Sequence, residues 1–361
     1  MNFNTIFLKS FRVLLLPIAV LYGLIIMIRN RLFDRDVLKS AAFNFPIICV
    51  GNLAVGGTGK SPMVEYLLEL LSPQYKMATL SRGYKRRTKG YALANDATTA
   101  LEIGDEPMQF AIKFPNVAVA VGEERIVAIP HLLQDHPELQ VIVLDDAFQH
   151  RTVRAGFNII LTEYSNLYTS DFFLPTGDLR DEWASAKRAQ VIIVTKCPPD
   201  LDEKAKSAIL RELKPLPSQK VFFTCIEYGM PYHICDRNIQ YAINYTDEVM
   251  LVCGIANPKP LKDFLLQKTK TYYQQDYPDH HIFSIDDLNE MKQRFDDIAA
   301  ERKLFITTEK DAVRLIKFKD ELASLPFFVI PIRHRILFDE SWHFNELLIK
   351  FIQDFNFNPN P

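Results

Sequence analysis

Short apolar runs recur along the first two thirds of the chain, and each has the length of a buried strand. They cover residues 45–50, 76–80, 117–121, 141–144, 158–162 and 190–195. Segments with apolar residues at helical spacing lie between several of these runs, and residues 62–71 are the clearest case. Apolar strands that alternate with helices are typical of a parallel sheet buried on both faces. We therefore predict an α/β fold in which a mostly parallel sheet is flanked by helices.

The pattern changes near residue 216, where a second group of elements begins. Residues 221–228 and 240–252 have the composition of strands, and residues 248–268 resemble the first strand, turn and helix of another α/β unit. A strand that runs into a helix (303–314), a strand (327–331) and a final helix (342–355) follow. We predict three parts: an N-terminal helix at 1–38, a larger domain at 39–220 and a smaller α/β domain at 221–361.

An uncharged apolar run extends from Val13 to Ile28 and is flanked by basic residues on both sides. As a helix it would be about 24 Å long at ~1.5 Å per residue, which is shorter than the ~30 Å hydrocarbon core of a bilayer. No small-residue cleavage site follows the run, which disfavours a cleaved signal peptide. We predict a helix on the membrane surface, with its basic flanks against anionic headgroups. The alternative is a hydrophobic helix that packs on the domain.

Composition and charge limit the classes of function. Apolar residues make up 48% of the chain and charged residues 24%, which is ordinary for a globular protein. The net charge of −2 gives no reason to expect a nucleic-acid partner. The five cysteines are scattered without a C-x-x-C pair, so the sequence disfavours a disulfide framework or a zinc site and fits a reducing cytoplasm.

A Gly-rich turn stands between the first buried run and the following helix, which is the context that a phosphate-binding loop (P-loop) requires. The match is [AG]-x4-GK-S, because Ala54 replaces the first glycine. Backbone N–H groups of such a loop converge on a nucleotide's phosphates at the start of the helix. We expect the nucleotide-binding residues to be Val55, Gly56, Gly57, Thr58, Gly59, Lys60, Ser61 and Pro62. An ordinary Gly-rich turn capped by Ser61 is the alternative.

The run at 141–144 ends in two carboxylates, Asp145 and Asp146, as a Walker B strand does. A carboxylate at the tip of a buried parallel strand lies beside the P-loop serine, so Ser61, Asp145 and Asp146 are the expected ligands of Mg²⁺. Residues 195–198 resemble the element that reads guanine, but Pro198 replaces the aspartate that guanine recognition needs. We therefore expect ATP rather than GTP.

Three further segments carry candidate chemistry. Arg82 follows the strand at 76–80, at the sheet edge where a substrate phosphate would lie. Asp105 and Glu106 precede a helix, where Asp105 is a candidate general base or, alternatively, the N-cap of that helix. Arg180 lies in a turn that leads to a helix, from which it could point into the site.

Taken together, these segments resemble the tetraacyldisaccharide 4′-kinase family of lipid A biosynthesis over nearly the whole chain. The resemblance is carried by the N-terminal apolar run and by the segments 55–61, 81–84, 104–107, 145–150, 177–180, 254–255, 278–281 and 308–311. The sequence departs from the family pattern at Ala54, Ser61 and Ala147, where serine, threonine and glycine are usual. Ser61 keeps the hydroxyl that a metal would need.

The resemblance implies a kinase that transfers the γ-phosphate of ATP to the 4′-hydroxyl of tetraacyldisaccharide 1-phosphate, a glycolipid, which gives lipid IVA. It implies a place on the cytoplasmic face of the bacterial inner membrane, and we expect a monomer. The resemblance places the general base at Asp105, with His280 as its partner. We further expect Lys60 and Arg180 as catalytic cations, Arg82, Glu106 and Asp146 at the substrate, and Mg²⁺ on Ser61, Asp145 and Asp146.

Two other classes of protein share some of these features. A membrane-associated ATPase switch of the deviant Walker A kind carries an extra lysine where this chain has Val55. A nucleotide-gated membrane adaptor without catalysis would need neither Asp105 nor His280. Loss of phosphate transfer without loss of ATP binding, on replacement of Asp105, distinguishes the kinase from both.

Overall fold

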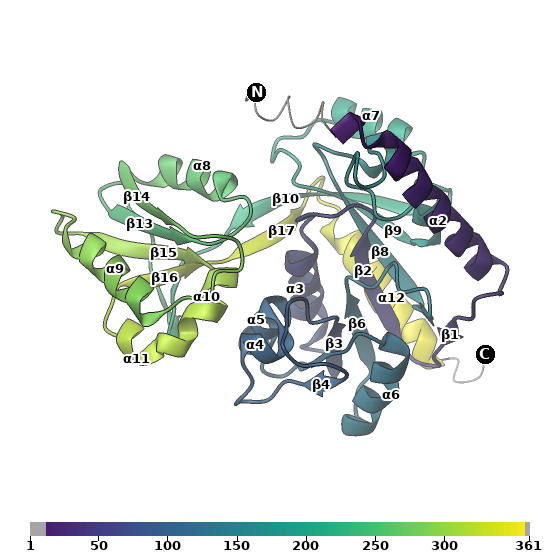
Figure 1. Ribbon diagram of the computed structural model, residues 1–361, viewed down its shortest axis with the longest axis horizontal. Coiled ribbons are helices and arrows are strands. Elements are labelled where there is room, and N and C mark those ends of the chain that lie inside the picture. Colours follow the sequence, from purple (N-terminus) through teal and green to yellow (C-terminus); the bar gives the residue numbers. More distant parts are fainter. Residues whose placement is uncertain (1–11, 358–361) are drawn as a thin grey trace.

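The computed structural model describes residues 12–357, which form two lobes joined by two long strands (Figure 1). The larger lobe is built on a nine-stranded sheet whose order is β17 (Ile332–Ile336), β10 (Lys220–Tyr228), β9 (Val191–Thr195), β8 (Phe157–Glu163), β2 (Ile47–Asn52), β6 (Val141–Asp145), β3 (Met77–Ser81), β5 (Ala118–Val121) and β4 (Ala92–Leu93). All its pairings are parallel except those of β17 and β4.

The smaller lobe holds a six-stranded sheet in the order β12 (Asp236–Gln240), β11 (Tyr232–His233), β16 (Phe327–Ile330), β15 (Lys303–Thr308), β13 (Glu248–Cys253) and β14 (Thr271–Asp276). Its four last-named strands are parallel. A separate two-stranded pair is formed by β1 (Ala41–Ala42) and β7 (Val153–Arg154). The predicted fold, with mostly parallel sheets and an N-terminal apolar helix, is confirmed.

Helices cover both sheets. The larger lobe contains α2 (Leu16–Asp34), α3 (Lys60–Leu71), α4 (Ala100–Ile103), α5 (Asp105–Lys113), α6 (Arg125–Asp135), η1 (Tyr168–Ser170), η2 (Trp183–Arg188), α7 (Glu203–Leu213) and α12 (Ser341–Phe357). The smaller lobe contains α8 (Lys259–Lys268), α9 (Ile285–Asp296), α10 (Glu309–Leu315), η3 (Ile316–Phe318) and α11 (Lys319–Leu322).

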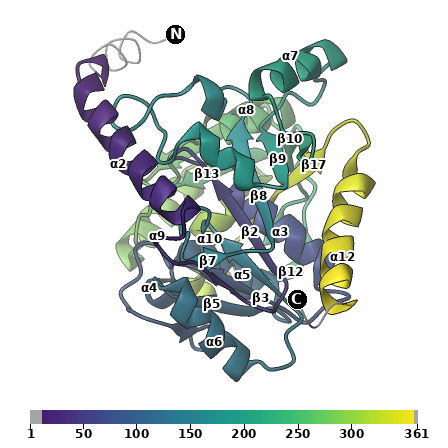
Figure 2. The ribbon, with the colours of Figure 1, turned by 90° about the vertical axis from the view of Figure 1, so that its right-hand side faces the viewer.

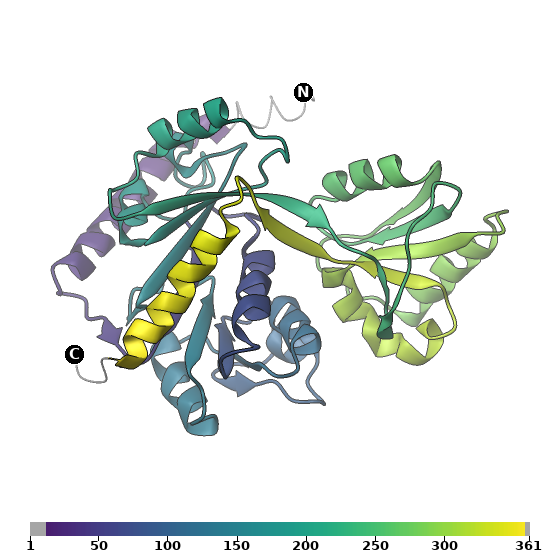
Figure 3. The same ribbon diagram turned by 180° about the vertical axis from the view of Figure 1, so that it is seen from behind.

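The buried strand β2 shows why helices are needed on both faces of the larger sheet. Ile48 and Val50 belong to the core that α3 and α12 close, whereas Ile47 and Cys49 belong to the core under α6. Side chains alternate across a strand, so a run that is apolar at every position must be covered twice. The core closed by α3 and α12 brings α12, from the far end of the chain, back across the sheet, as Figure 3 shows.

The strands β10 and β17 form the connection between the lobes (Figure 3). β10 begins parallel to β9 in the larger sheet and continues antiparallel to β17. The chain thus leaves the larger lobe along β10, builds the smaller lobe and returns along β17 to α12. Both β17 and α12 lie in the range 221–361, which was expected to form the smaller domain. They belong instead to the larger lobe, because β17 pairs in the larger sheet and α12 packs on it.

The helix α2 runs along one side of the larger lobe (Figure 2). Most of its large apolar side chains are exposed. Its buried residues are Ala19, Gly23, Asn30 and Phe33. By length and composition alone, α2 is long and apolar enough to cross a membrane. Only 22% of its most apolar 18 residues are buried in the protein. A helix that packed on the domain through its apolar face would bury most of its large side chains, and this one leaves them exposed.

Candidate active site

The predicted P-loop lies between β2 and α3, and its glycines adopt the conformations that such a loop needs. Gly56 has φ 112°, and Gly59, the N-cap of α3, has φ 87°, in the region that a side chain rarely adopts. No atom lies within 4 Å of a Cβ built on Gly56 or Gly57, so this side of the loop is open. The N-terminus of α3 therefore faces an open space that an anion could enter.

Residues from three strands form hydrogen bonds to Thr58 and Gly59 of the P-loop. Asn52 Nδ2 donates to Thr58 Oγ1 at 2.9 Å, and Thr195 Oγ1 donates to the Thr58 carbonyl oxygen at 2.9 Å. His334 Nε2 lies 2.9 Å from the carbonyl oxygen of Gly59 and donates to it. His334 comes from β17, so the strand that returns from the smaller lobe contacts the P-loop directly.

The two Walker B carboxylates lie beside the P-loop but in different environments. Asp145 is level with Val50 in the parallel pair of β2 and β6, and only 3% of it is exposed. Burial, together with the negative charges of Glu106 and Asp146, raises the pKa of Asp145 to about 7. Ser81 Oγ donates to Asp145 Oδ2 at 3.2 Å. Asp145 is thus a carboxylate that a nearby cation would stabilise.

Asp146 turns toward two cations. Its φ of 49° directs it away from the strand, and its carboxylate lies 3.8 Å from Lys60 Nζ and contacts the guanidinium of Arg180. Burial would raise the pKa of Asp146, but the charges of Lys60 and Arg180 outweigh this effect and hold the pKa below its ordinary value. This carboxylate therefore stays ionised and fixes both cations at the phosphate end of the P-loop.

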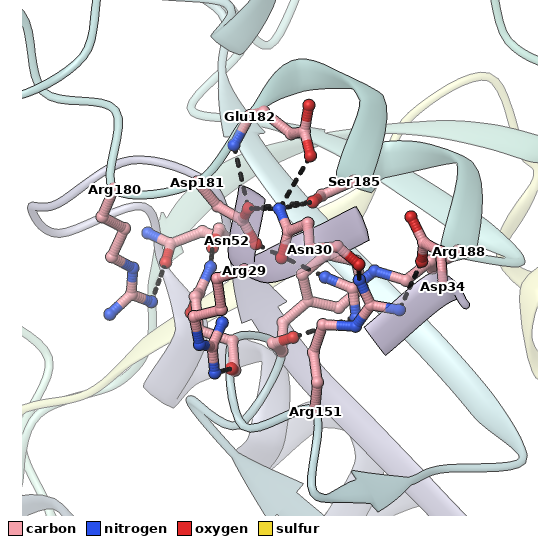
Figure 4. A network of polar contacts seen from close by, with 12 residues as sticks. Arg29, Asn30, Asp34, Asn52, Arg151, Arg180, Asp181, Glu182, Ser185 and Arg188 are labelled. Carbon is pink, nitrogen blue, oxygen red and sulfur yellow. Dashed lines mark hydrogen bonds and ion pairs between the residues drawn. The ribbon is translucent and has the colours of Figure 1, made fainter. Parts of the chain in front are cut away.

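The segment that carries Arg180 is attached to the P-loop through its backbone. The Arg180 N–H donates to the Leu53 carbonyl oxygen at 2.9 Å, and the Val55 N–H donates to the Asp178 carbonyl oxygen at 2.7 Å. The guanidinium of Arg180 also contacts Asn52 Oδ1 (Figure 4). The predicted position of Arg180, pointing into the site from a turn, agrees with this arrangement.

Asp105 is the first residue of α5, and its carboxylate faces the smaller lobe. The N-cap of α5 is Gly104, so the interpretation of Asp105 as the N-cap is wrong. His280 Nδ1 donates to Asp105 Oδ2 at 2.7 Å, and Arg314 Nε donates to the same oxygen at 3.0 Å. Burial alone would raise the pKa of Asp105, but the hydrogen bonds and charges of Arg314 and His280 lower it below its ordinary value.

Arg314 was not predicted from the sequence. It lies on α10, 209 residues after Asp105, and its Nη2 is 2.5 Å from Asp105 Oδ2. Its Nη1 is 3.4 Å from Asp311 Oδ1, and Asp311 in turn accepts hydrogen bonds from Thr308 Oγ1 and the Gly254 N–H. Thr308 is the N-cap of α10 and accepts from the Asp311 N–H, and Arg314 is the next residue on the same helical face as Asp311. The capping spacing of Thr308 and Asp311 in the sequence could have pointed to Arg314.

His280 has φ 65° and is held on its other side by the same helix. Lys310 Nζ lies 3.3 Å from His280 Nε2. When the ring is neutral and its Nδ1–H donates to Asp105, Nε2 is the nitrogen that accepts from the ammonium. The neighbouring His281 bonds Asp287 instead, at 3.0 Å. The structure therefore places His280, and not His281, against Asp105.

The remaining predicted residues lie around this centre. Arg82 is exposed, and its side chain has no hydrogen-bond or ion-pair partner among residues 12–357. Its charge, with burial and Arg125, helps to lower the pKa of His150 to about 4. Glu106 lies near enough to Asp145 to raise its pKa. Ser61 and Pro62 occupy the first turn of α3.

The donor set fits Mg²⁺ better than a metal enclosed entirely by protein. In the part of the chain that the structure describes, no three His, Cys, Asp or Glu side chains gather closely enough to hold a metal by themselves. Mg²⁺ takes oxygen ligands and usually keeps one or two carboxylates together with substrate phosphates and water. Asp145, Asp146 and the Ser61 hydroxyl are oxygen donors of this kind at the end of the P-loop.

Comparison with known proteins shows the family of this chain. The family model described as tetraacyldisaccharide-1-P 4′-kinase (LpxK) matches residues 11–353. The chain belongs to the LpxK family. It is 47% identical to the tetraacyldisaccharide 4′-kinase of Flavobacterium johnsoniae over 91% of this chain and 96% of that protein. It is 41% identical to that of Bacteroides thetaiotaomicron over 94% and 93% of the two chains.

A crystal structure of LpxK from Aquifex aeolicus in complex with ATP has the same fold. Its TM-score is 0.73 with 26% sequence identity, and the match covers 95% of this chain and 99% of that one. As an LpxK family member, the protein is an ATP-binding kinase that phosphorylates tetraacyldisaccharide 1-phosphate at the 4′ position in lipid A biosynthesis. The family and the activity predicted from the sequence are confirmed.

Proposed function

We propose that the space between the two lobes is the place of phosphate transfer, with Asp105 as the general base. The observation that carries this proposal is the distribution of contacts on its carboxylate. His280 and Arg314 all bond Oδ2, and no described residue donates to Oδ1. Oδ1 is thus available to accept the proton of the 4′-hydroxyl as that oxygen attacks the γ-phosphorus and ADP leaves.

The partners of Asp105 fix its orientation and its charge. Arg314 and His280 keep the carboxylate ionised, which a proton acceptor must be. Both partners belong to the smaller lobe, whereas Asp105 belongs to the larger one. The base is therefore correctly oriented only when the lobes are in contact, and closure of the lobes on the substrates would complete the site.

The phosphates of ATP would lie against residues 55–62, with Lys60 and Arg180 beside the transferred group. Lys60 is a compact charge at the start of α3, and Arg180 offers a planar fork, so the two bind phosphate oxygens in different ways. Arg82, exposed and without a partner among the described residues, would bind a substrate phosphate. Asp146 would order both site cations, and Glu106 would lie beside the sugar.

Mg²⁺ would be held by Ser61, Asp145 and Asp146. When bound, the ion neutralises charge on the β- and γ-phosphate oxygens. Asp145 is buried with a raised pKa, so a divalent cation beside it would favour the ionised form that binds metal.

We also propose that α2 lies on the cytoplasmic face of the inner membrane, so that the acyl chains of the glycolipid stay in the bilayer. The exposed apolar residues of α2 and its exposed basic residues Arg31 and Arg35 support this placement. The protein would act as a monomer. Its domains would be the helix α2, the P-loop domain, and a smaller domain inserted between β10 and β17.

Replacement of Asp105 tests the proposal. In Asp105→Ala, transfer of ³²P from labelled ATP to tetraacyldisaccharide 1-phosphate in detergent micelles should fall by about 100-fold or more, because general bases contribute 10²–10⁴-fold. ATP binding should persist. The surface variant Asp135→Asn is the control and should match the wild type. Transfer at an undiminished rate by Asp105→Ala would show that another group accepts the proton.

A further inference from the structure

The helix α2 is joined to the active site by a buried amide. Asn30 is 1% exposed, although it lies on a helix most of whose side chains are exposed or half-buried. Its Nδ2 donates to Asp181 Oδ1 at 2.8 Å and to Glu182 Oε1 at 2.8 Å, and it lies 3.2 Å from Ser185 Oγ (Figure 4). A buried polar side chain costs free energy unless it is bonded, so this amide has a specific role in the fold.

The acceptor of this bond is the residue that follows Arg180. Asp181 is 1% exposed and its Oδ1 also accepts from Ser185 Oγ and from the Glu182 N–H, both at 2.9 Å. The backbone N–H of Asp181 reaches the Leu53 carbonyl oxygen at 3.2 Å, as that of Arg180 does at 2.9 Å. Asn30 thus fixes the side chain of a residue whose backbone is already attached to the P-loop.

A second contact from α2 reaches the same turn. The Tyr22 hydroxyl donates to the Arg180 carbonyl oxygen at 3.2 Å, eight residues before Asn30 on the same helix. A third contact runs from Arg29 to the Gln149 carbonyl oxygen at 3.0 Å, and Gln149 Nε2 donates to the Asn52 carbonyl oxygen at 2.7 Å. The helix therefore contacts both segments that surround the guanidinium of Arg180.

We propose that Asn30 is a positioning residue for Arg180: through Asp181 it sets where the arginine meets the transferred phosphate. This inference rests on the role of Arg180 proposed above. The place needs a donor, because the Asn30 amide donates to two carboxylates, whereas an aspartate at position 30 would bring a third negative charge against Asp181 and Glu182. The position of Arg180 then depends on the position of the helix α2.

The test compares Asn30→Leu in two backgrounds. Leucine has nearly the same volume and a high helix propensity, but it cannot donate. In the wild-type background, kcat in micelles should fall by about 10- to 100-fold, since a displacement of ~1 Å in a catalytic group costs about that much. The KM for ATP and the binding to anionic vesicles should stay within twofold, because Lys60, the P-loop and the apolar face of α2 are unchanged.

In the Arg180→Ala background, Asn30→Leu should reduce kcat by less than twofold, because a residue that acts through Arg180 has nothing left to position. Ile28→Leu is the matched control: it places a leucine on the same helix at a side chain that is 56% exposed, and it should keep kcat within twofold. Ser185→Ala is a second variant, for use if Asn30→Leu folds poorly. It removes one hydrogen bond to the Asp181 carboxylate and should also lower kcat, by less than Asn30→Leu does.

An equal loss of kcat in both backgrounds, or no loss from Asn30→Leu and Ser185→Ala, would overturn the inference while leaving the role of Arg180 intact. If Arg180→Ala itself had the wild-type kcat, the proposed role of Arg180 would be wrong and the inference would fall with it. The two failures are therefore distinguishable.

Discussion

The two oxygens of Asp105 differ more than the sequence could indicate. One oxygen accepts bonds from His280 and Arg314, and no residue among 12–357 donates to the other. The same partners that orient the carboxylate also lower its pKa, so they make it a weaker base while keeping it ionised. Asp105 can accept a proton only when it is ionised. At low pH the lowered pKa therefore favours catalysis, because it keeps a larger fraction of Asp105 ionised.

Arg314→Gln should move the acid limb of the pH–kcat profile to higher pH. Arg314 lowers the pKa of Asp105, and its removal raises that pKa, so a larger fraction of Asp105 is protonated and inactive at each acidic pH. The loss of kcat should be largest below neutrality and should shrink as the pH rises. Profiles of the variant and of Arg294→Gln, a surface arginine paired with Glu290, provide the comparison. An acid limb at the wild-type position would contradict this account of Arg314.

Sequence patterns predicted the local parts of the site and missed the distant ones. The P-loop and Walker B carboxylates stand next to recognisable strands, and the pairing of Asp105 with His280 followed from the family resemblance. Arg314, Asn30 and His334 have partners more than 100 residues away in the chain. No local periodicity contains such pairings, because they arise from the way elements distant in the chain pack together.

At the scale of elements, β17 connects the smaller lobe to the P-loop. His334 on this strand is buried between Thr224 on β10, 2.9 Å from Nδ1, and the Gly59 carbonyl oxygen, 2.9 Å from Nε2. Burial lowers the pKa of His334 to about 4, so the ring is neutral at physiological pH and accepts through Nδ1 while it donates through Nε2. The sequence analysis placed residues 221–361 in the smaller domain, so this range wrongly included β17, which pairs in the larger sheet.

His334→Leu should raise the KM for ATP by about tenfold, equivalent to ~1.4 kcal/mol. Leucine fills the space but leaves the buried Gly59 carbonyl without a donor, and an unsatisfied buried acceptor costs about 1–3 kcal/mol. The loop can recover part of this cost only by moving away from the geometry that binds phosphate. His233→Leu, which removes a buried histidine of the smaller lobe, is the control. Equal KM values in steady-state kinetics for His334→Leu and the wild type would contradict a role for β17 in shaping the P-loop.

At the scale of the whole molecule, buried charges join the lobes behind the site. Lys113 Nζ lies 2.6 Å from Glu65 on the P-loop helix and 2.6 Å from Glu309 on α10. Burial and the charge of Glu309 raise the pKa of Glu65 to about 7, so part of the repulsion is relieved by a proton. The helix that carries Arg314 is thereby tied to the helix that carries Lys60.

The outer surface of the molecule predicts how it meets the membrane. Leu21 and Ile25 on α2 are 60% and 57% exposed. Changing both to asparagine should reduce sedimentation with phosphatidylglycerol-containing vesicles at least fivefold, since burial of each apolar side chain contributes about 1.5–3 kcal/mol. Leu266→Asn, at a 58% exposed position on α8, should bind vesicles as the wild type does. Undiminished sedimentation of the α2 variant would place the membrane contact elsewhere.

The most direct measurement is a structure of the protein with a non-hydrolysable ATP analogue, Mg²⁺ and the glycolipid acceptor. The account predicts that the 4′-hydroxyl lies about 3 Å from Asp105 Oδ1, within hydrogen-bond reach, with the γ-phosphate on its other side against Lys60 and Arg180. A 4′-hydroxyl that met a different base, or a γ-phosphate directed away from Asp105, would contradict it.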